Sequence, residues 1–176
     1  MTARTQETYT KLFQEEKERP VFIAVDQRRS MFFGSQYQVK SVTAARLAAA
    51  IAWASHANRD RIGAVVFNDH NQADLRAKQG KFALLKFIHT LSDFNAELAV
   101  AQATGGSPTI SLRLVLEELL RVARPGSLVH VVSDFYDFDR HCEQTLSMLS
   151  RHCTVELLKV FDPIERQLPN LSLIHI

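Results

Sequence analysis

Short, nearly uninterrupted runs of apolar residues, with His130 as the one polar side chain among them, mark the centre of the predicted fold. They cover residues 21–25, 62–67 and 128–132. A strand without polar alternation is buried on both faces, as in the middle of a parallel sheet. The pattern therefore predicts central strands at these places. Weaker patterns indicate an edge strand at residues 74–77 and a last strand at residues 155–161.

Between the strands, apolar residues recur every three or four positions, which is the spacing of one face of a helix. The positions expected to face the core are Ala44, Leu47, Ala48, Ile51 and Ala54 or Ser55 in the first helix, Leu84, Phe87, Ile88 and Leu91 in the next, Leu112, Val115, Leu116, Leu119 and Val122 or Ala123 in the third, and Cys142, Thr145, Leu146 and Leu149 in the last. Because strands and helices alternate, we predict a doubly wound α/β fold with a mostly parallel, Rossmann-like sheet and helices on both faces. We expect a single domain over residues 1–170.

Composition adds the expectation of a globular domain that does not bind nucleic acid. Hydrophobic residues make up 46% of the chain and charged residues 23%, while the formal net charge is only +2 at pH 7. No segment approaches the roughly 20 apolar residues that a membrane-spanning helix needs, and the first residues lack the apolar core of a signal peptide. Cys142 and Cys153 lack the spacing of a paired motif, so we expect reduced thiols in a cytoplasmic protein.

The loops that follow the predicted strands carry the residues best suited to bind a ligand, since ligands gather at the carboxyl ends of strands in open α/β sheets. Asp26 and Ser30 follow the first strand, Thr109 lies in a later loop, and Asp134 follows the last of the central strands. These positions resemble the metal-ion-dependent adhesion site of von Willebrand factor A domains, in which Asp-x-Ser-x-Ser, a threonine and a second aspartate hold an ion. Carboxylate and hydroxyl oxygens are ligands that Mg²⁺ and Mn²⁺ prefer.

The sequence departs from that pattern inside the site. Arg28 stands where the middle serine is expected, and Ile110 occupies the place of the threonine, with Thr109 one residue early. An arginine offers hydrogen-bond donors but no acceptor, and its charge repels a divalent ion. One interpretation keeps a degenerate Mg²⁺ or Mn²⁺ site. The other, which we prefer, expects no cofactor: Arg28 fills the place of the ion and pairs with Asp26 and Asp134.

Further segments, taken in their order along the chain, are similar to the domain of unknown function 58 family of bacteria, a branch of the von Willebrand factor A-like proteins. The segments that carry the resemblance are residues 12–21 (LFQEEKERPV), 31–35 (MFFGS), 59–63 (RDRIG) and 121–127 (RVARPGS). The likeness runs from about Thr2 to Pro169. It implies a von Willebrand factor A-like fold. It also implies a partner, a MoxR-type AAA+ ATPase, with which such proteins are thought to assemble or activate other proteins.

Both ends of the chain are expected to be incomplete. Family members usually carry a further segment before the stretch that resembles residues 2–5, so Met1 is interpreted as an internal methionine. Residues 171–176 (LSLIHI) match the in-frame translation of a transposon adapter used in library preparation, and a short apolar strand is the alternative. We therefore leave this tail out of the predicted fold.

We expect a protein-interaction module rather than an enzyme. Its expected binding face consists of the loops around Asp26, Ser30, Thr109 and Asp134. Phe32 and Phe33, next to the first of these loops, are candidate partner contacts, whereas core packing is the default for other aromatic residues such as Trp53.

The alternative function is a metal-dependent hydrolase, either a nuclease or a phosphatase. In that interpretation Asp26 and Asp134 hold Mg²⁺, with Asp137 and Asp139 nearby. Against it, Arg28 lies inside the acidic cluster, and no Gly-rich phosphate loop follows any predicted strand.

Overall fold

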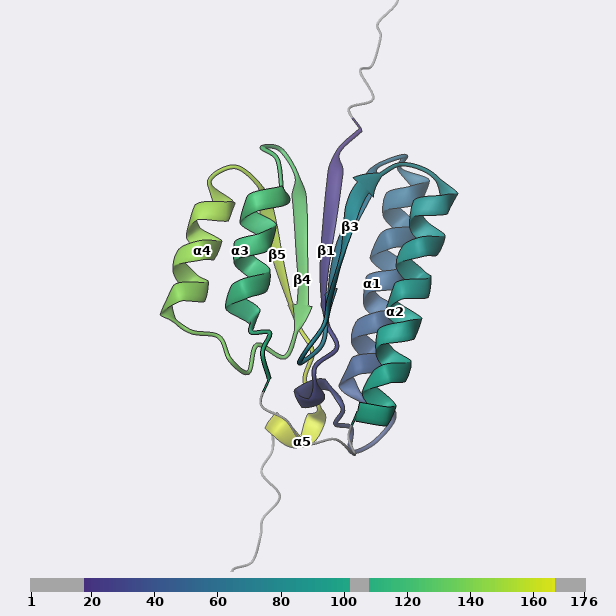
Figure 1. Ribbon diagram of the computed structural model, residues 1–176, viewed down its shortest axis with the longest axis vertical. Helices are drawn as coiled ribbons and strands as arrows, with labels where there is room; N and C mark the ends of the chain where they lie inside the picture. The colour runs from purple at the N-terminus through teal and green to yellow at the C-terminus, as the bar shows by residue number, and fades with distance from the viewer. Residues whose placement is uncertain (1–17, 102–107, 167–176) are drawn as a thin grey trace, which may run out of the picture.

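The computed structural model describes residues 18–101 and 108–166 of the chain, and a five-stranded sheet forms its centre (Figure 1). The strands lie in the order β3-β2-β1-β4-β5. All are parallel except the outermost strand β3, which pairs antiparallel with β2. They are β1 (Pro20–Asp26), β2 (Arg61–Phe67), β3 (Gln72–Lys78), β4 (Leu128–Ser133) and β5 (Thr154–Lys159). β3 is longer than the predicted residues 74–77, and β5 ends before the predicted residue 161.

Helices cover both faces of the sheet (Figure 1). One face carries α1 (Lys40–Ala57) and α2 (Lys81–Ala101), and the other carries α3 (Leu112–Val122) and α4 (Arg140–Ser150). The short η1 (Arg29–Met31) and α5 (Pro163–Arg166) lie beyond the ends of β1 and β5. The predicted doubly wound α/β fold with a mostly parallel sheet is therefore confirmed.

Successive residues of β1 enter opposite cores, which explains its uninterrupted apolar run. Val21, Ile23 and Val25 pack in the core under α1 and α2, while Phe22 and Ala24 pack in the core under α3 and α4. Because helices cover both faces, a polar side chain at any of these positions would be buried without a partner.

The core-facing side of α1 differs from the prediction, because Leu47 is 37% exposed. The buried line along this helix consists of Ala44, Ala48, Ala52 and Ser55. These small side chains let the helix pack close to the sheet, which leaves the longer Leu47 on its flank. Trp53, for which core packing was the default, is also about half exposed and meets His56 edge-on.

Two further expectations concern the cysteines and the absence of a membrane-spanning helix. Cys142 and Cys153 are both free and buried. Within residues 18–101 and 108–166, no helix combines the length and apolar character needed to cross a membrane. The adapter-like tail at residues 171–176 and the stretch at residues 2–5 lie outside the described residues.

Phe87 and Phe82, both on α2, give a matched test of the core. Phe87 is fully buried, whereas Phe82 is 78% exposed. We expect Phe87→Ala to lower the free energy of unfolding by about 3–5 kcal/mol, because it removes buried aromatic surface and leaves a cavity. Phe82→Ala should change it by less than about 0.5 kcal/mol. Urea unfolding measures both values, and equal effects would contradict this assignment of the core.

Candidate functional site

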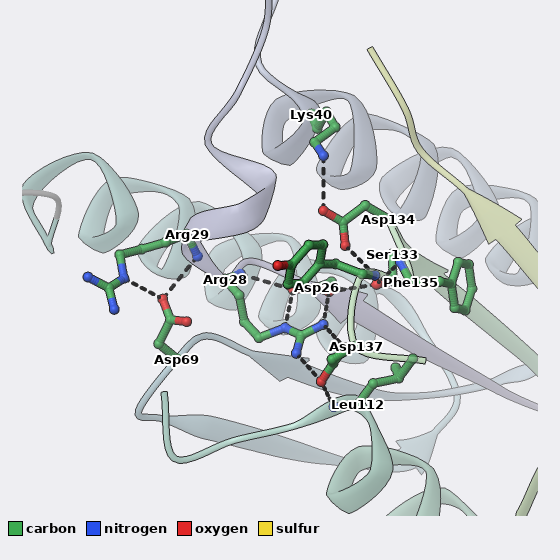
Figure 2. A network of polar contacts seen from close by, with 11 residues as sticks. Asp26, Arg28, Arg29, Lys40, Asp69, Leu112, Ser133, Asp134, Phe135 and Asp137 are labelled. Atoms are coloured by element: carbon green, nitrogen blue, oxygen red, sulfur yellow. Dashed lines mark hydrogen bonds and ion pairs between the residues drawn. The ribbon is translucent and has the colours of Figure 1, made fainter. Parts of the chain in front are cut away.

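The carboxyl ends of β1 and β4 bring polar side chains together at one edge of the sheet (Figure 2). Asp26 is the last residue of β1 and is completely buried. Ser133, the last residue of β4, donates a hydrogen bond from its Oγ to Asp26 Oδ2 at 2.6 Å. Because β1 and β4 are parallel neighbours, the loops that follow them meet at this edge.

The guanidinium of Arg28 lies between two carboxylates (Figure 2). Its Nε and Nη2 donate to Asp26 at 3.0 and 2.7 Å, and its Nη1 and Nη2 donate to Asp137 at 2.6 and 2.8 Å. Only 7% of the Arg28 side chain is exposed, and its Cζ lies 5.3 Å from the centre of the Phe67 ring. Paired, charge-assisted hydrogen bonds of this kind fix both the position and the plane of a guanidinium.

Burial and the Arg28 charge together govern the ionisation of this cluster. Burial raises the pKa of Asp26 above its usual value, although hydrogen bonds from Arg28 and Ser133 oppose it. Burial also opposes ionisation of Asp137, but hydrogen bonds from Arg28 and from a backbone amide outweigh it, so the pKa of Asp137 is lowered. Burial disfavours the charged form of Arg28, but its two carboxylate partners outweigh this and raise its pKa. Arg28 is therefore a permanent positive charge at the centre of the site.

The second carboxylate at Arg28 is Asp137 rather than Asp134, which corrects the pairing predicted from the sequence. Between these two aspartates, Phe135 has a left-handed backbone with a φ of 57°. The turn directs Asp134 towards α1 and brings Asp137 beside Arg28 (Figure 2). Asp137 also accepts a hydrogen bond from the Leu112 amide at 2.9 Å, so the same carboxylate anchors the start of α3.

Lys40, the first residue of α1, is a second cation at this edge of the sheet. Its Nζ lies 2.9 Å from Asp134 Oδ2 and 2.8 Å from Glu165 Oε1. Burial would lower the pKa of Lys40, but hydrogen bonds to these carboxylates outweigh it, so the pKa of Lys40 is raised. Lys40 thus connects α1 with the end of β4 and with α5.

The remaining predicted positions lie beside this network, and no hydrogen bond between described residues joins their side chains to it. Ser30 lies on η1, and its buried Oγ has no hydrogen-bond partner among residues 18–101 and 108–166. Thr109 donates from its amide and its Oγ1 to the Asp69 carbonyl, at 2.8 and 3.1 Å. Phe32 is half-buried and Phe33 is exposed.

Sequence reasoning missed Lys40 and Asp69. Asp69 Oδ2 accepts from the Arg29 amide at 2.9 Å and lies 3.3 Å from Arg29 Nε, so it links the loops after β1 and β2. Nothing in the sequence around Asp69 marks this contact. Lys40 did leave a signal: a lysine is unfavourable at the positive end of the helix dipole. A lysine at the start of a predicted helix therefore indicates a carboxylate partner nearby.

The side chains that the structure describes do not fit a divalent ion in this arrangement. Mg²⁺ needs oxygen ligands at about 2.0–2.1 Å in near-octahedral geometry. Both oxygens of Asp26 already accept from Arg28, whose guanidinium fills the space towards Asp137, and Asp134 pairs with Lys40. Among the residues described, no group of three or more His, Cys, Asp or Glu side chains is placed to hold a metal ion.

Comparisons with known sequences identify similar proteins. A model of the family described as "Protein of unknown function DUF58" matches residues 1–176. The uncharacterized proteins Rv1480 of Mycobacterium tuberculosis and Mb1516 of Mycobacterium bovis are each 24% identical to this chain over 172 residues. The alignment covers 98% of this chain and 52% of each relative, so the chain spans about half the length of the curated relatives it matches.

A comparison with solved structures supports the fold. The manganese-loaded TRAP protein of Plasmodium vivax, a von Willebrand factor A domain protein, is similar with a TM-score of 0.52. The match covers 82% of this chain and 58% of that chain at 14% sequence identity. At this identity the likeness shows a common fold and nothing further.

Asp137→Asn tests the pairing with Arg28 through its pH dependence. Because the pKa of Asp137 is lowered in the folded chain, its ionised form stabilises the fold above the ordinary value of 3.8. This contribution is lost as the pH falls from there through the folded-state pKa. At pH 7 we expect the free energy of unfolding of the variant to be about 1.5–3 kcal/mol lower than that of the natural protein. This is the size of a hydrogen bond to a charged group.

The deficit of Asp137→Asn should shrink at pH 3, because below the ordinary pKa of 3.8 the unfolded natural chain binds a proton at Asp137. Urea unfolding at both pH values measures the deficit. Asp93→Asn is the control, because Asp93 forms only an exposed pair with His89. A deficit of the same size at pH 7 and pH 3 would contradict the assigned ion pair.

Proposed function

Because this chain belongs to the DUF58 family and folds as a von Willebrand factor A-like domain, we propose that it is a non-enzymatic protein-interaction module. Its binding surface comprises the loops at the carboxyl edge of the sheet, at residues 29–37, 134–138 and 160–164, here called the loop face. The family is described as one of unknown function. The support for this proposal therefore comes from the geometry of the loops.

The observation that carries the proposal is a concentration of exposed aromatic and apolar side chains on the loop face. Tyr37 is 95% exposed and Tyr136 is 86% exposed. The other members of this group are Phe33, Phe138, Phe161 and Ile164. Single exposed apolar residues are ordinary on a protein surface, but aromatic residues gathered on adjoining loops are typical of protein interfaces.

Hydrogen bonds and ion pairs hold these loops in place. Asp162 accepts from the Ser35 amide at 2.8 Å and also from the Ser35 hydroxyl, which joins the loop after β5 to the loop after β1. Arg28 joins the loop after β1 to the loop after β4 through Asp137. A surface that is ordered in advance loses less conformational entropy when a partner binds. This order supports a binding role.

The contacts of the acidic residues favour a non-enzymatic role over the hydrolase alternative. A metal-dependent hydrolase needs its carboxylates to hold the ion that activates water. Asp26 instead accepts from Arg28, and Asp134 pairs with Lys40. Asp139, another member of the acidic cluster, caps the start of α4.

As the first partner to test we propose a MoxR-type AAA+ ATPase. The support is the family, because proteins that resemble this one are often encoded beside such an ATPase and are thought to work with it. We also propose a cytoplasmic location, since Cys142 and Cys153 are free and buried, as expected in a reducing compartment.

Replacing Tyr37 and Tyr136 together by alanine tests the loop face. We expect the dissociation constant for the ATPase encoded beside the natural gene to rise at least about tenfold. Truncating an important interface aromatic costs more than about 1 kcal/mol, and 1.4 kcal/mol is a factor of about ten. Titration calorimetry on the full-length protein measures the change.

Phe82→Ala is the matched control for this experiment, because Phe82 is also highly exposed, at 78%, but lies at the start of α2, at the opposite end of the sheet. It should leave the dissociation constant unchanged. An unchanged constant for the double variant would remove the loop face from the proposal. Failure of the natural protein to bind would remove the ATPase as its partner.

Hydrolysis assays test the non-enzymatic part of the proposal. With Mn²⁺ present, we expect the natural protein to turn over p-nitrophenyl phosphate or single-stranded DNA no faster than Asp134→Asn does. Turnover that the natural protein shows and Asp134→Asn loses would establish the hydrolase alternative instead.

A further inference from the structure

We propose that the Arg28 guanidinium is a tethered cation that takes the place of a divalent ion beneath the loop face. In the metal sites that this sequence resembles, an ion joins the end of the first strand to the loop after a later strand. Arg28 makes the same connection with its own side chain, between Asp26 at the end of β1 and Asp137 in the loop after β4. The loops then keep their arrangement without any metal.

The contacts of the guanidinium are those of a bridging cation. Nε and Nη2 hold both oxygens of Asp26, and Nη1 and Nη2 hold both oxygens of Asp137. Through Asp137 the bridge extends to the Leu112 amide, so it also fixes the start of α3. One buried cation therefore organises the ends of separate elements, which is the structural role of an ion in such a site.

The charges at this edge also match those of a divalent ion. Arg28 brings one positive charge to Asp26 and Asp137, and Lys40 brings another to Asp134 at 2.9 Å. Both cations are fixed in place by ion pairs and are largely buried. A divalent ion entering here would meet two positive charges, and their repulsion opposes its binding.

Ser30 provides an independent observation. Its Oγ is buried and has no hydrogen-bond partner in the part of the chain that the structure describes, although buried polar groups are nearly always hydrogen-bonded. In the Asp-x-Ser-x-Ser pattern, a hydroxyl at this position is an ion ligand. An unpartnered Ser30 is the expected result where an arginine supplies the charge of the ion but not its full coordination.

The inference deepens the proposed function and, as far as a partner is concerned, rests on it. An ion can offer an open coordination position to a carboxylate of a partner. Arg28 offers none, because its side chain is 7% exposed and its donors are engaged by Asp26 and Asp137. The partner therefore contacts the aromatic side chains of the loop face, and its binding requires no divalent ion held by this chain.

Chemical rescue of Arg28→Ala tests the tethered cation directly. The variant leaves a guanidinium-sized space between Asp26 and Asp137. We expect about 20 mM guanidinium chloride to raise its melting temperature by about 3–6 °C, the shift for a ligand at roughly ten times its dissociation constant. The same concentration of sodium chloride or urea should give no such rise.

Arg121→Ala is the matched control for the rescue, because Arg121 forms an exposed pair with Glu118. Guanidinium should not stabilise Arg121→Ala or the natural protein. Stabilisation of all three proteins by the same amount, or of none, would overturn the inference.

A second arm uses Mn²⁺ and electron paramagnetic resonance. The natural protein should bind no Mn²⁺ below about 100 µM, whereas Arg28→Ser, which restores the Asp-x-Ser-x-Ser pattern, should bind it. The double variant Asp26→Asn/Arg28→Ser is the control and should not. Mn²⁺ binding by the natural protein overturns the inference even if neither Arg28 variant folds.

These outcomes are distinct from those of the proposed function. If guanidinium rescues Arg28→Ala but the double variant of Tyr37 and Tyr136 binds its partner normally, the tethered cation is supported and the loop face is excluded as the binding surface. If the partner is lost on replacing these tyrosines but the natural protein binds Mn²⁺, the loop face is supported and the tethered cation is overturned.

Discussion

The rest of this structure depends on the buried contact between one guanidinium and two carboxylates. Removing such charges from water costs several kcal/mol per ion, and only well-aligned, nearly complete pairing offsets this cost. The sheet provides that alignment, because the parallel ends of β1 and β4 place Asp26 and the loop of Asp137 next to each other. With Arg28 held between them, the positions of η1 and of the start of α3 are also determined.

Above this buried layer, different side chains are available for contact with other molecules. The ion pairs of Arg28 and Lys40 and the hydrogen bonds of Asp162 define where each loop lies, and they are turned inward. Tyr37 and Tyr136 extend from the same loops into solvent. The polar groups thus determine the shape of the loop face, while its aromatic groups supply the apolar surface that a partner would cover.

The fold could be predicted because its signals are local. A strand covered on both faces needs an uninterrupted apolar run such as residues 21–25, and an amphipathic helix needs a periodic stripe. The side of α1 that packs was harder to predict, since an alanine-rich helix is not oriented by its few large residues. In the site, the position of Asp26 followed from the end of its strand. The pairing of Arg28 with Asp137 did not, because it depends on the left-handed turn at Phe135, and the Lys40 contact with Asp134 joins residues that are 94 positions apart in the sequence.

A cation that belongs to the chain also changes how the protein recovers its structure after unfolding. A metal-dependent site refolds completely only when it meets its ion, so its final step is bimolecular and slows as the ion becomes scarce. Arg28 stays within two residues of Asp26 along the chain even in the unfolded state. Its encounter with that carboxylate is therefore intramolecular, and the rate at which the loops regain their arrangement does not depend on the concentration of anything else in solution.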